Sequence, residues 1–121
     1  MTLQRPPTDL WVHAQTRLAA QDGVPITVLR RGNADIGMLL LKINLLNGMA
    51  LIFTEAYCGD ARFWTPILGA TPMLEKIADD FIDDQARADP DLWLVEIEDK
   101  KGRLWFPGKI LDLDAPPPSP F

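Results

Sequence analysis

The dipeptide Asn47-Gly48 constrains the fold of this chain more than any other feature of its sequence. It follows one apolar stretch, Gly37 to Leu46, and precedes a second, Met49 to Glu55. Asn and Gly both accept the positive φ angles of a type I′ turn, which connects two antiparallel strands tightly. We therefore predict a β-hairpin with a type I′ turn, in which these two strands pair antiparallel.

The first of these strands has two faces of different character, because side chains alternate along a strand. One face holds Met38, Leu40, Lys42 and Asn44. The opposite face is purely apolar, so we expect it to lie in the core; it consists of Leu39, Leu41, Ile43 and Leu45. The apolar run over residues 36–46 is shorter than the roughly 20 residues that cross a bilayer. It predicts a core strand and no membrane partner.

A helix is predicted near the start of the chain. Thr8 or Asp9 serves as its N-cap, and Gly23 suits its C-terminal end. Apolar residues four apart, with Trp11 beside them, predict its buried stripe, which consists of Leu10, Ala14 and Leu18.

A second helix is marked more clearly. Thr71-Pro72 supplies an N-cap and a proline at the first helical position, and the helix is expected to end near Ala88 because Asp89 precedes a proline. Acidic side chains lie opposite its apolar positions, which are Met73, Leu74, Ile77, Ala78, Phe81 and Ile82.

Further strands are predicted by their alternation and β-branched residues at 25–31, 62–68, 92–98 and 103–106. Pro66 lacks a ladder donor, so its strand is expected to lie at an edge or to end early. The resulting order is α-β-β-β-β-α-β-β. It predicts the α+β class, with an antiparallel β-meander sheet flanked by two helices. We assign residues 8–107 to this single domain and residues 108–121 to a proline-rich C-terminal tail.

Charge is distributed unevenly along the 121 residues. The net charge is −5, yet residues 75–99 alone hold ten carboxylates against Lys76 and Arg87, a net of −8. A stretch of this kind repels phosphate backbones, so nucleic acid is not expected as a partner. It favours a basic protein surface instead.

The sequence offers little material for metal or nucleophile chemistry. It has one histidine, His13, and one cysteine, Cys58, which cannot form a zinc cage. The single cysteine fits a reducing compartment, and the first residues show no secretory signal, so we expect a cytoplasmic protein. No catalytic residue, cofactor or metal ligand is predicted.

Two motifs resemble functional patterns only superficially. Arg30-Arg31-Gly32-Asn33 has one glycine and no helix after it, so it lacks the donors of a phosphate loop. Asp91 and Glu98-Asp99-Lys100 resemble a nuclease motif, but they lie along one predicted strand, more than about 20 Å apart. Neither motif supports the corresponding chemistry. The first is expected to be a turn with two solvated arginines, with a small anion site as the alternative.

The segment Asp89 to Asp99, followed by Gly102-Arg103, resembles a short bacterial family, the domain of unknown function number 1491. Two other segments agree with this resemblance, Leu10 to Ala14 and Val28 to Lys42. The resemblance covers about residues 10–105. It implies an architecture and a bacterial cytoplasmic setting, and no mechanism.

Two functions follow from these observations. The absence of a catalytic constellation, with four tryptophans and an edge strand, favours a non-enzymatic protein-interaction module. Its partner is then another protein or a second copy in a homodimer. The alternative is a small-ligand-binding protein or minor enzyme. Its polar anchors are Arg30, Arg31, Glu96 and Glu98. Trp93, on the same strand as the two glutamates, is a further binding residue.

Overall fold

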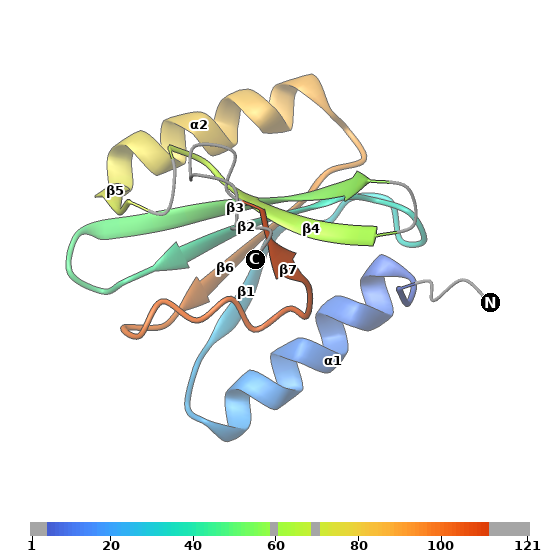
Figure 1. Ribbon diagram of the computed structural model, residues 1–121, viewed down its shortest axis with the longest axis horizontal. Helices are drawn as coiled ribbons and strands as arrows, with labels where there is room; N and C mark the ends of the chain where they lie inside the picture. Colours follow the sequence, from blue (N-terminus) through green and yellow to red (C-terminus); the bar gives the residue numbers. More distant parts are fainter. Residues whose placement is uncertain (1–4, 59–60, 69–70, 112–121) are drawn as a thin grey trace, which may run out of the picture.

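The structure is a computed structural model that describes residues 5–58, 61–68 and 71–111 (Figure 1). Two helices, α1 (Thr8–Gln21) and α2 (Glu75–Ala88), lie on either side of one sheet. The described strands are β1 (Ile26–Arg30), β2 (Leu39–Asn44), β3 (Met49–Cys58), β4 (Ala61–Pro66), β5 (Met73–Leu74), β6 (Trp93–Glu98) and β7 (Lys109–Ile110). Neither described helix is long and apolar enough to cross a membrane.

The sheet is mixed, with strand order β1-β6-β2-β3-β4-β7 and β5 paired to β3. The expected α+β class is confirmed, but the expected antiparallel meander is wrong as a description of the whole sheet. Only β2, β3 and β4 form a meander, whereas β6 inserts between β1 and β2 and runs parallel to β2. A connection through a helix can return a strand parallel to an earlier one, and α2 provides that connection here.

The hairpin between β2 and β3 is confirmed, while its predicted turn type is wrong. Leu41 pairs with Phe53 and Asn44 with Ala50 in an antiparallel ladder. The positive φ angles fall on Leu46 (61°) and Gly48 (86°), and not on the intervening asparagine. The amide of Leu45 donates to the carbonyl of Met49 at 3.0 Å, so the connection between these two residues is a three-residue loop.

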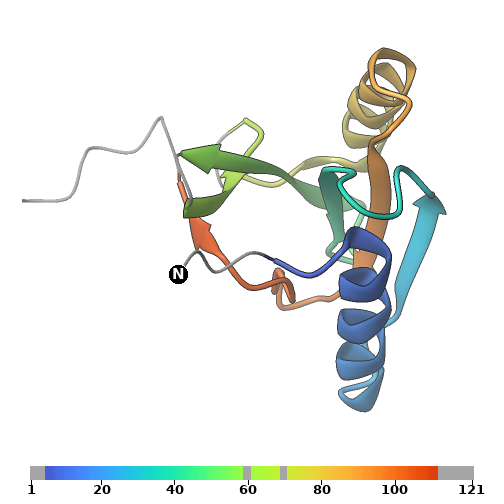
Figure 2. The ribbon, with the colours of Figure 1, turned by 90° about the vertical axis from the view of Figure 1, so that its right-hand side faces the viewer.

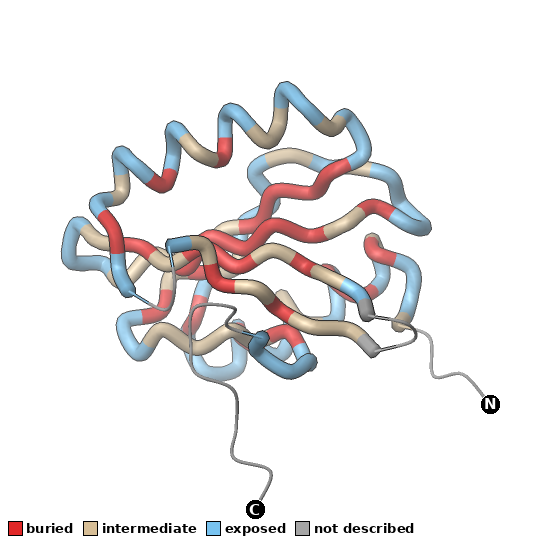
Figure 3. Tube along the Cα trace, turned by 45° about the horizontal axis from the view of Figure 1, so that its top comes forward, coloured by how far each residue is buried: buried red, intermediate tan, exposed pale blue. Residues whose placement is uncertain are grey.

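Both faces of the sheet are buried, each beneath one helix (Figure 2). The core on the α1 side includes Trp11, Leu39, Leu41, Ile43, Trp93, Val95 and Ile97. The core on the α2 side includes Leu40, Ile52, Ala78, Ile82 and Leu94. Of the purely apolar face predicted for β2, Leu39, Leu41 and Ile43 are buried as expected, and Leu45 is half-buried. Buried positions gather along the middle strands, and the outer side of α2 remains exposed (Figure 3).

The predicted buried stripe of α1 is wrong. Leu10 is 60% exposed and Leu18 is 50% exposed, and Ala14 is exposed as well. The helix instead buries the neighbouring side, which carries Thr8, Trp11, Val12 and Ala19. Trp11 offers the largest apolar surface on this helix, and its burial decides which side faces the sheet.

Helix α2 begins later than predicted and ends where predicted. Thr71-Pro72 precede the helix without starting it, because Met73 and Leu74 first pair with β3 as β5. The helix then runs from Glu75 to Ala88. Of its predicted apolar face, Leu74 and Ile77 are exposed.

The C-terminal part also differs from expectation. Residues 103–106 form no strand. The chain instead adds β7, which runs parallel to β4 on the side of β4 away from β3. β7 falls within residues 108–121, so the sheet extends into the segment assigned to the tail. The remainder of that segment, residues 112–121, lies outside the described residues.

Candidate functional site

The free edge of β1 is the candidate site. β1 is the first strand of the sheet and pairs only with β6 among the described strands, so its other side has no strand beside it (Figure 2). Thr27, Val28 and Leu29 are exposed along it. An unpaired row of backbone donors and acceptors is a template for pairing with another chain.

The side chains along this edge do little to discourage pairing. Val28 is 37% exposed and Leu29 is 48% exposed, and no residue from Ile26 to Leu29 carries a charge. Natural sheets commonly protect an edge with lysine, proline or a bulge. Here Pro25 precedes the strand and a bulge follows Val28, so the stretch between them is left open.

The backbone of β1 determines which groups face outward. The amide of Glu98 donates to the carbonyl of Pro25 at 3.0 Å, so the backbone of Pro25 points toward β6. Backbone groups of successive residues alternate between the two sides of a strand. Thr27 therefore also points toward β6, whereas the N–H and C=O groups of Ile26 and Val28 point toward the free edge.

Arg30, one of the predicted ligand anchors, holds the end of β1 in place. Its guanidinium donates to the carbonyl of Ala86 at 2.6 Å, to that of Leu92 at 2.8 and 3.1 Å, and to that of Asp89. These carbonyls belong to the end of α2 and the segment that leads into β6. Arg30 thereby joins β1 to the connection between α2 and β6.

Arg31 lies in different surroundings. Its guanidinium carbon is 5.0 Å from the ring centre of Trp93, a cation–π contact. Trp93 is buried in the core on the α1 side, and its indole N–H donates to the carbonyl of Asn33 at 2.7 Å. Arg30 and Arg31 thus serve opposite sides of the sheet and do not form one site.

Glu96 lies beneath α2 in an ionic cluster around Lys42. The ammonium of Lys42 is 3.1 Å from Glu96, 2.7 Å from Asp79 and 3.0 Å from Glu75. Burial alone would lower the pKa of Lys42, but hydrogen bonds to these three carboxylates raise it above its ordinary value. Glu98, the other predicted anchor, lies two residues further along β6 and is half-buried.

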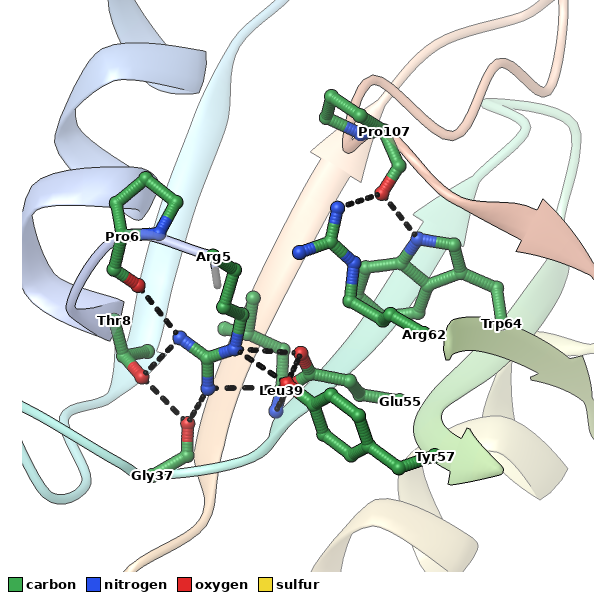
Figure 4. A network of polar contacts seen from close by, with 10 residues as sticks. All are labelled: Arg5, Pro6, Thr8, Gly37, Leu39, Glu55, Tyr57, Arg62, Trp64 and Pro107. Carbon is green, nitrogen blue, oxygen red and sulfur yellow. Dashed lines mark hydrogen bonds and ion pairs between the residues drawn. The ribbon is translucent and has the colours of Figure 1, made fainter. Parts of the chain in front are cut away.

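A second buried network was not predicted from the sequence (Figure 4). Arg5 pairs with Glu55 on β3 at 2.7 Å, and Glu55 also accepts the amide of Leu39 at 3.1 Å. Arg5 and the hydroxyl of Thr8 both donate to the carbonyl of Gly37, at 2.8 and 2.7 Å. The network joins Arg5 and the first residue of α1 to the beginning of β2 and to β3.

Tyr57 lies at the outer side of this network. Its hydroxyl accepts from Arg5 at 2.9 Å and donates to Glu55 at 3.0 Å. Partial burial raises the pKa of Tyr57; the hydrogen bond from Arg5 opposes this, and the charge of Glu55 adds to it. Arg5 lies 50 positions from Glu55 and 52 from Tyr57, so no local sequence motif predicts these contacts.

An aromatic cluster adjoins the network. The ring of Phe106 lies edge-on to Trp11, at 5.2 Å between centres, and to Trp64 at 6.2 Å. Arg62 lies over Trp11 at 4.3 Å and donates to the carbonyl of Pro107 at 2.9 Å (Figure 4). Arg62 thus joins α1 to the segment that leads into β7. Among the described residues, no group of three or more His, Cys, Asp or Glu side chains is arranged to hold a metal ion.

The fold and these contacts define an α+β protein in which two helices cover a mixed sheet, with ionic clusters around Arg5 and Lys42 on its two faces. The chain belongs to the DUF1491 family, whose family model, described as "Protein of unknown function (DUF1491)", matches residues 7–107. The resemblance inferred from the sequence is therefore confirmed. Family membership assigns no activity, and a search of curated proteins finds no match.

Solved structures agree with this assignment. A crystal structure of a DUF1491 family protein from Caulobacter crescentus CB15 is 39% identical, with a TM-score of 0.76, and covers 87% of this chain and 98% of its own. An NMR structure of a DUF1491 family protein from the same organism is 38% identical, with a TM-score of 0.74. The match covers 92% of this chain and 98% of that protein. Protein Atu0922 from A. tumefaciens shares the fold, with a TM-score of 0.66 and 21% identity. The match covers 78% of this chain and 86% of that protein.

Proposed function

We propose that this chain is a non-enzymatic protein-interaction module that accepts an extended strand of a partner chain along the free edge of β1. The observation that carries the proposal is the uncharged, exposed stretch of β1 between Pro25 and the bulge after Val28. Addition of a strand to a sheet edge is a common mode of peptide recognition, in which backbone hydrogen bonds supply affinity and side chains supply selectivity.

The edge is held in a fixed conformation before a partner binds. β1 is paired to β6 over Ile26 to Arg30, and the guanidinium of Arg30 binds three carbonyl groups at the far end of the strand. A strand that is already ordered loses little conformational entropy when a second strand adds to it. This arrangement supports a preformed docking edge.

Exposed apolar side chains of α1 enlarge the surface next to the edge. α1 lies against β1, and its outward side carries Leu10 and Leu18. A partner that occupies the edge can also cover these leucines. The one cysteine of the chain supports action in the reducing cytoplasm of a bacterium, where disulfides are rare.

A peptide with the sequence of residues 24–31 serves as the test strand, and amide chemical shifts of the protein report where it binds. We expect saturable shifts on β1 and on the adjoining side of α1. Lysine on an edge strand opposes pairing, so Val28→Lys is expected to abolish these shifts. Ile77→Lys, which places the same change on an exposed site of α2, is expected to preserve them.

Two results contradict the proposal. One is the absence of shifts on β1 in the wild-type protein at saturating peptide. The other is binding that persists unchanged in Val28→Lys, which would place the peptide elsewhere.

A further inference from the structure

We infer that the occupant of the β1 edge is a second copy of this chain, paired antiparallel through its own β1. The inference rests on the proposed function and adds the identity of the partner and the register. It follows from the charges at the two ends of β1, from the direction of its backbone groups, and from the position of α1.

The two ends of the strand carry opposite charges. Asp22 lies just before it and is exposed, and Arg31 lies just after it and is exposed. Antiparallel pairing brings Arg31 of each copy to the end that carries Asp22 of the other. Parallel pairing would instead place like charges side by side. The edge is therefore complementary to itself in the antiparallel direction.

The backbone selects a register. Ile26 and Val28 point their N–H and C=O groups outward, so an antiparallel partner has to present the same pair of residues. If Ile26 of one copy lies opposite Val28 of the other, the outward N–H and C=O groups of both residues are hydrogen-bonded. Thr27 of one copy then lies opposite Thr27 of the other, on the two-fold axis. Thr27 is then a non-hydrogen-bonded pair, in which the two Cα atoms lie about 4.5 Å apart.

The helices add area to this contact. A two-fold axis perpendicular to the sheet brings both copies of α1 to the same face of the joined sheet, beside the shared edge. A stable interface covers roughly 800 Å² on each partner, more than a short strand supplies. The exposed leucines of α1, Leu10 and Leu18, offer additional apolar surface at that position.

Disulfide trapping tests the register directly. In a Cys58→Ser background, Thr27→Cys is expected to cross-link two copies under mild oxidation, because disulfides form between Cα atoms about 4.4–6.8 Å apart. Leu29→Cys is the matched control on the same strand. Its two copies would lie four register positions apart, roughly 13 Å, and should remain monomeric on denaturing gels.

Charge reversal tests the direction of pairing by light scattering. Arg31→Glu and Asp22→Arg are each expected to raise the dimer dissociation constant about tenfold. The contact between Arg31 and Asp22 occurs twice in a two-fold dimer, so each substitution removes two ion pairs. The double variant is expected to recover most of the wild-type affinity. Unfolding in urea checks that each variant is folded, since Arg31 also contacts Trp93 and Asp22 lies 3.5 Å from Arg103.

The outcomes separate this inference from the proposed function. A wild-type protein that stays monomeric at its highest soluble concentration, with no cross-link at Thr27→Cys, overturns the second copy as partner. Binding of the 24–31 peptide to β1 in that case still supports the docking edge, and failure of both experiments overturns both. A dimer that forms without the Thr27→Cys cross-link overturns the inferred pairing.

Discussion

The Nε atom of Arg5 lies 2.7 Å from a carboxylate oxygen of Glu55, and both side chains are almost completely buried, with 8% and 0% exposed. The pair joins residues 50 positions apart and is completed by Thr8, Gly37 and Tyr57. Charges removed from water to this extent depend on each other, because either one alone would be buried without compensation.

Arg5→Met is therefore expected to lower the free energy of unfolding by about 3 kcal/mol, measured with urea. Arg5→Met combined with Glu55→Leu should recover most of that loss, because no charge then remains buried. Lys76→Met breaks an exposed pair with Asp80 and serves as the control with little effect. A double variant less stable than Arg5→Met would contradict this account.

Lys42→Met is expected to destabilise the protein by about 2 kcal/mol at neutral pH, because Glu75, Asp79 and Glu96 lose their common cation. The pKa of Lys42 is raised in the folded state, so its contribution is fully present below the unfolded pKa of about 10.4 and is lost as pH rises through the folded value. The stability gap between wild type and variant should stay constant up to about pH 10 and shrink above it. Urea unfolding across this range measures the gap, and a gap that widens would contradict the assignment.

Asp99 gives the opposite dependence on pH. It is buried and accepts hydrogen bonds from Arg103 at 2.7 Å, from the amide of Lys101 at 2.8 Å and from the indole of Trp105 at 2.9 Å. Burial alone would raise the pKa of Asp99, but these hydrogen bonds lower it. Its contribution is present above the unfolded pKa of about 3.9 and is lost as pH falls through the folded value.

Asp99→Asn should therefore cost about 1–2 kcal/mol of unfolding free energy at pH 7, with the difference from wild type closing below about pH 4. Thermal unfolding at the two pH values provides the measurement. A difference of equal size at pH 7 and pH 3 would show that the ionised form is not what matters.

Arg30→Lys is expected to destabilise the protein by about 1–2 kcal/mol, because an ammonium cannot reproduce the planar set of donors that binds the carbonyls of Ala86, Asp89 and Leu92. Arg31→Lys provides the matched control, since it keeps the cation over Trp93 and should have a smaller effect. Equal losses in the two variants would argue against a special role for Arg30. Both are measured by urea unfolding.

The sequence predicts those parts of the fold that local patterns determine. The hairpin of β2 and β3, the apolar face of β2 and the end of α2 at Ala88 follow from alternation, turn residues and a proline, and the structure has them. The position of β6 between β1 and β2 does not follow, because the alternation of Trp93 to Glu98 is the same whichever strands lie beside it.

The orientation of α1 and the buried networks depend on contacts that local patterns do not contain. Leu10 and Leu18 have the spacing of a buried stripe, yet Trp11 is buried instead, because its ring packs against Trp64 and Phe106. Arg30 was expected as a ligand anchor, whereas its guanidinium donates hydrogen bonds to the carbonyl of Leu92, 62 residues away. Such pairings are settled by tertiary structure alone.

Residue-resolved hydrogen exchange tests the central claim, that the edge of β1 receives a partner strand, most directly. The amides of Ile26 and Val28 point away from β6, and that of Ile43 lies within the ladder at the centre of the sheet. Exchange at Ile26 and Val28 is predicted to slow as protein concentration rises, or on adding the 24–31 peptide, while Ile43 does not change. Equally fast exchange at both amides under all of these conditions would contradict the claim.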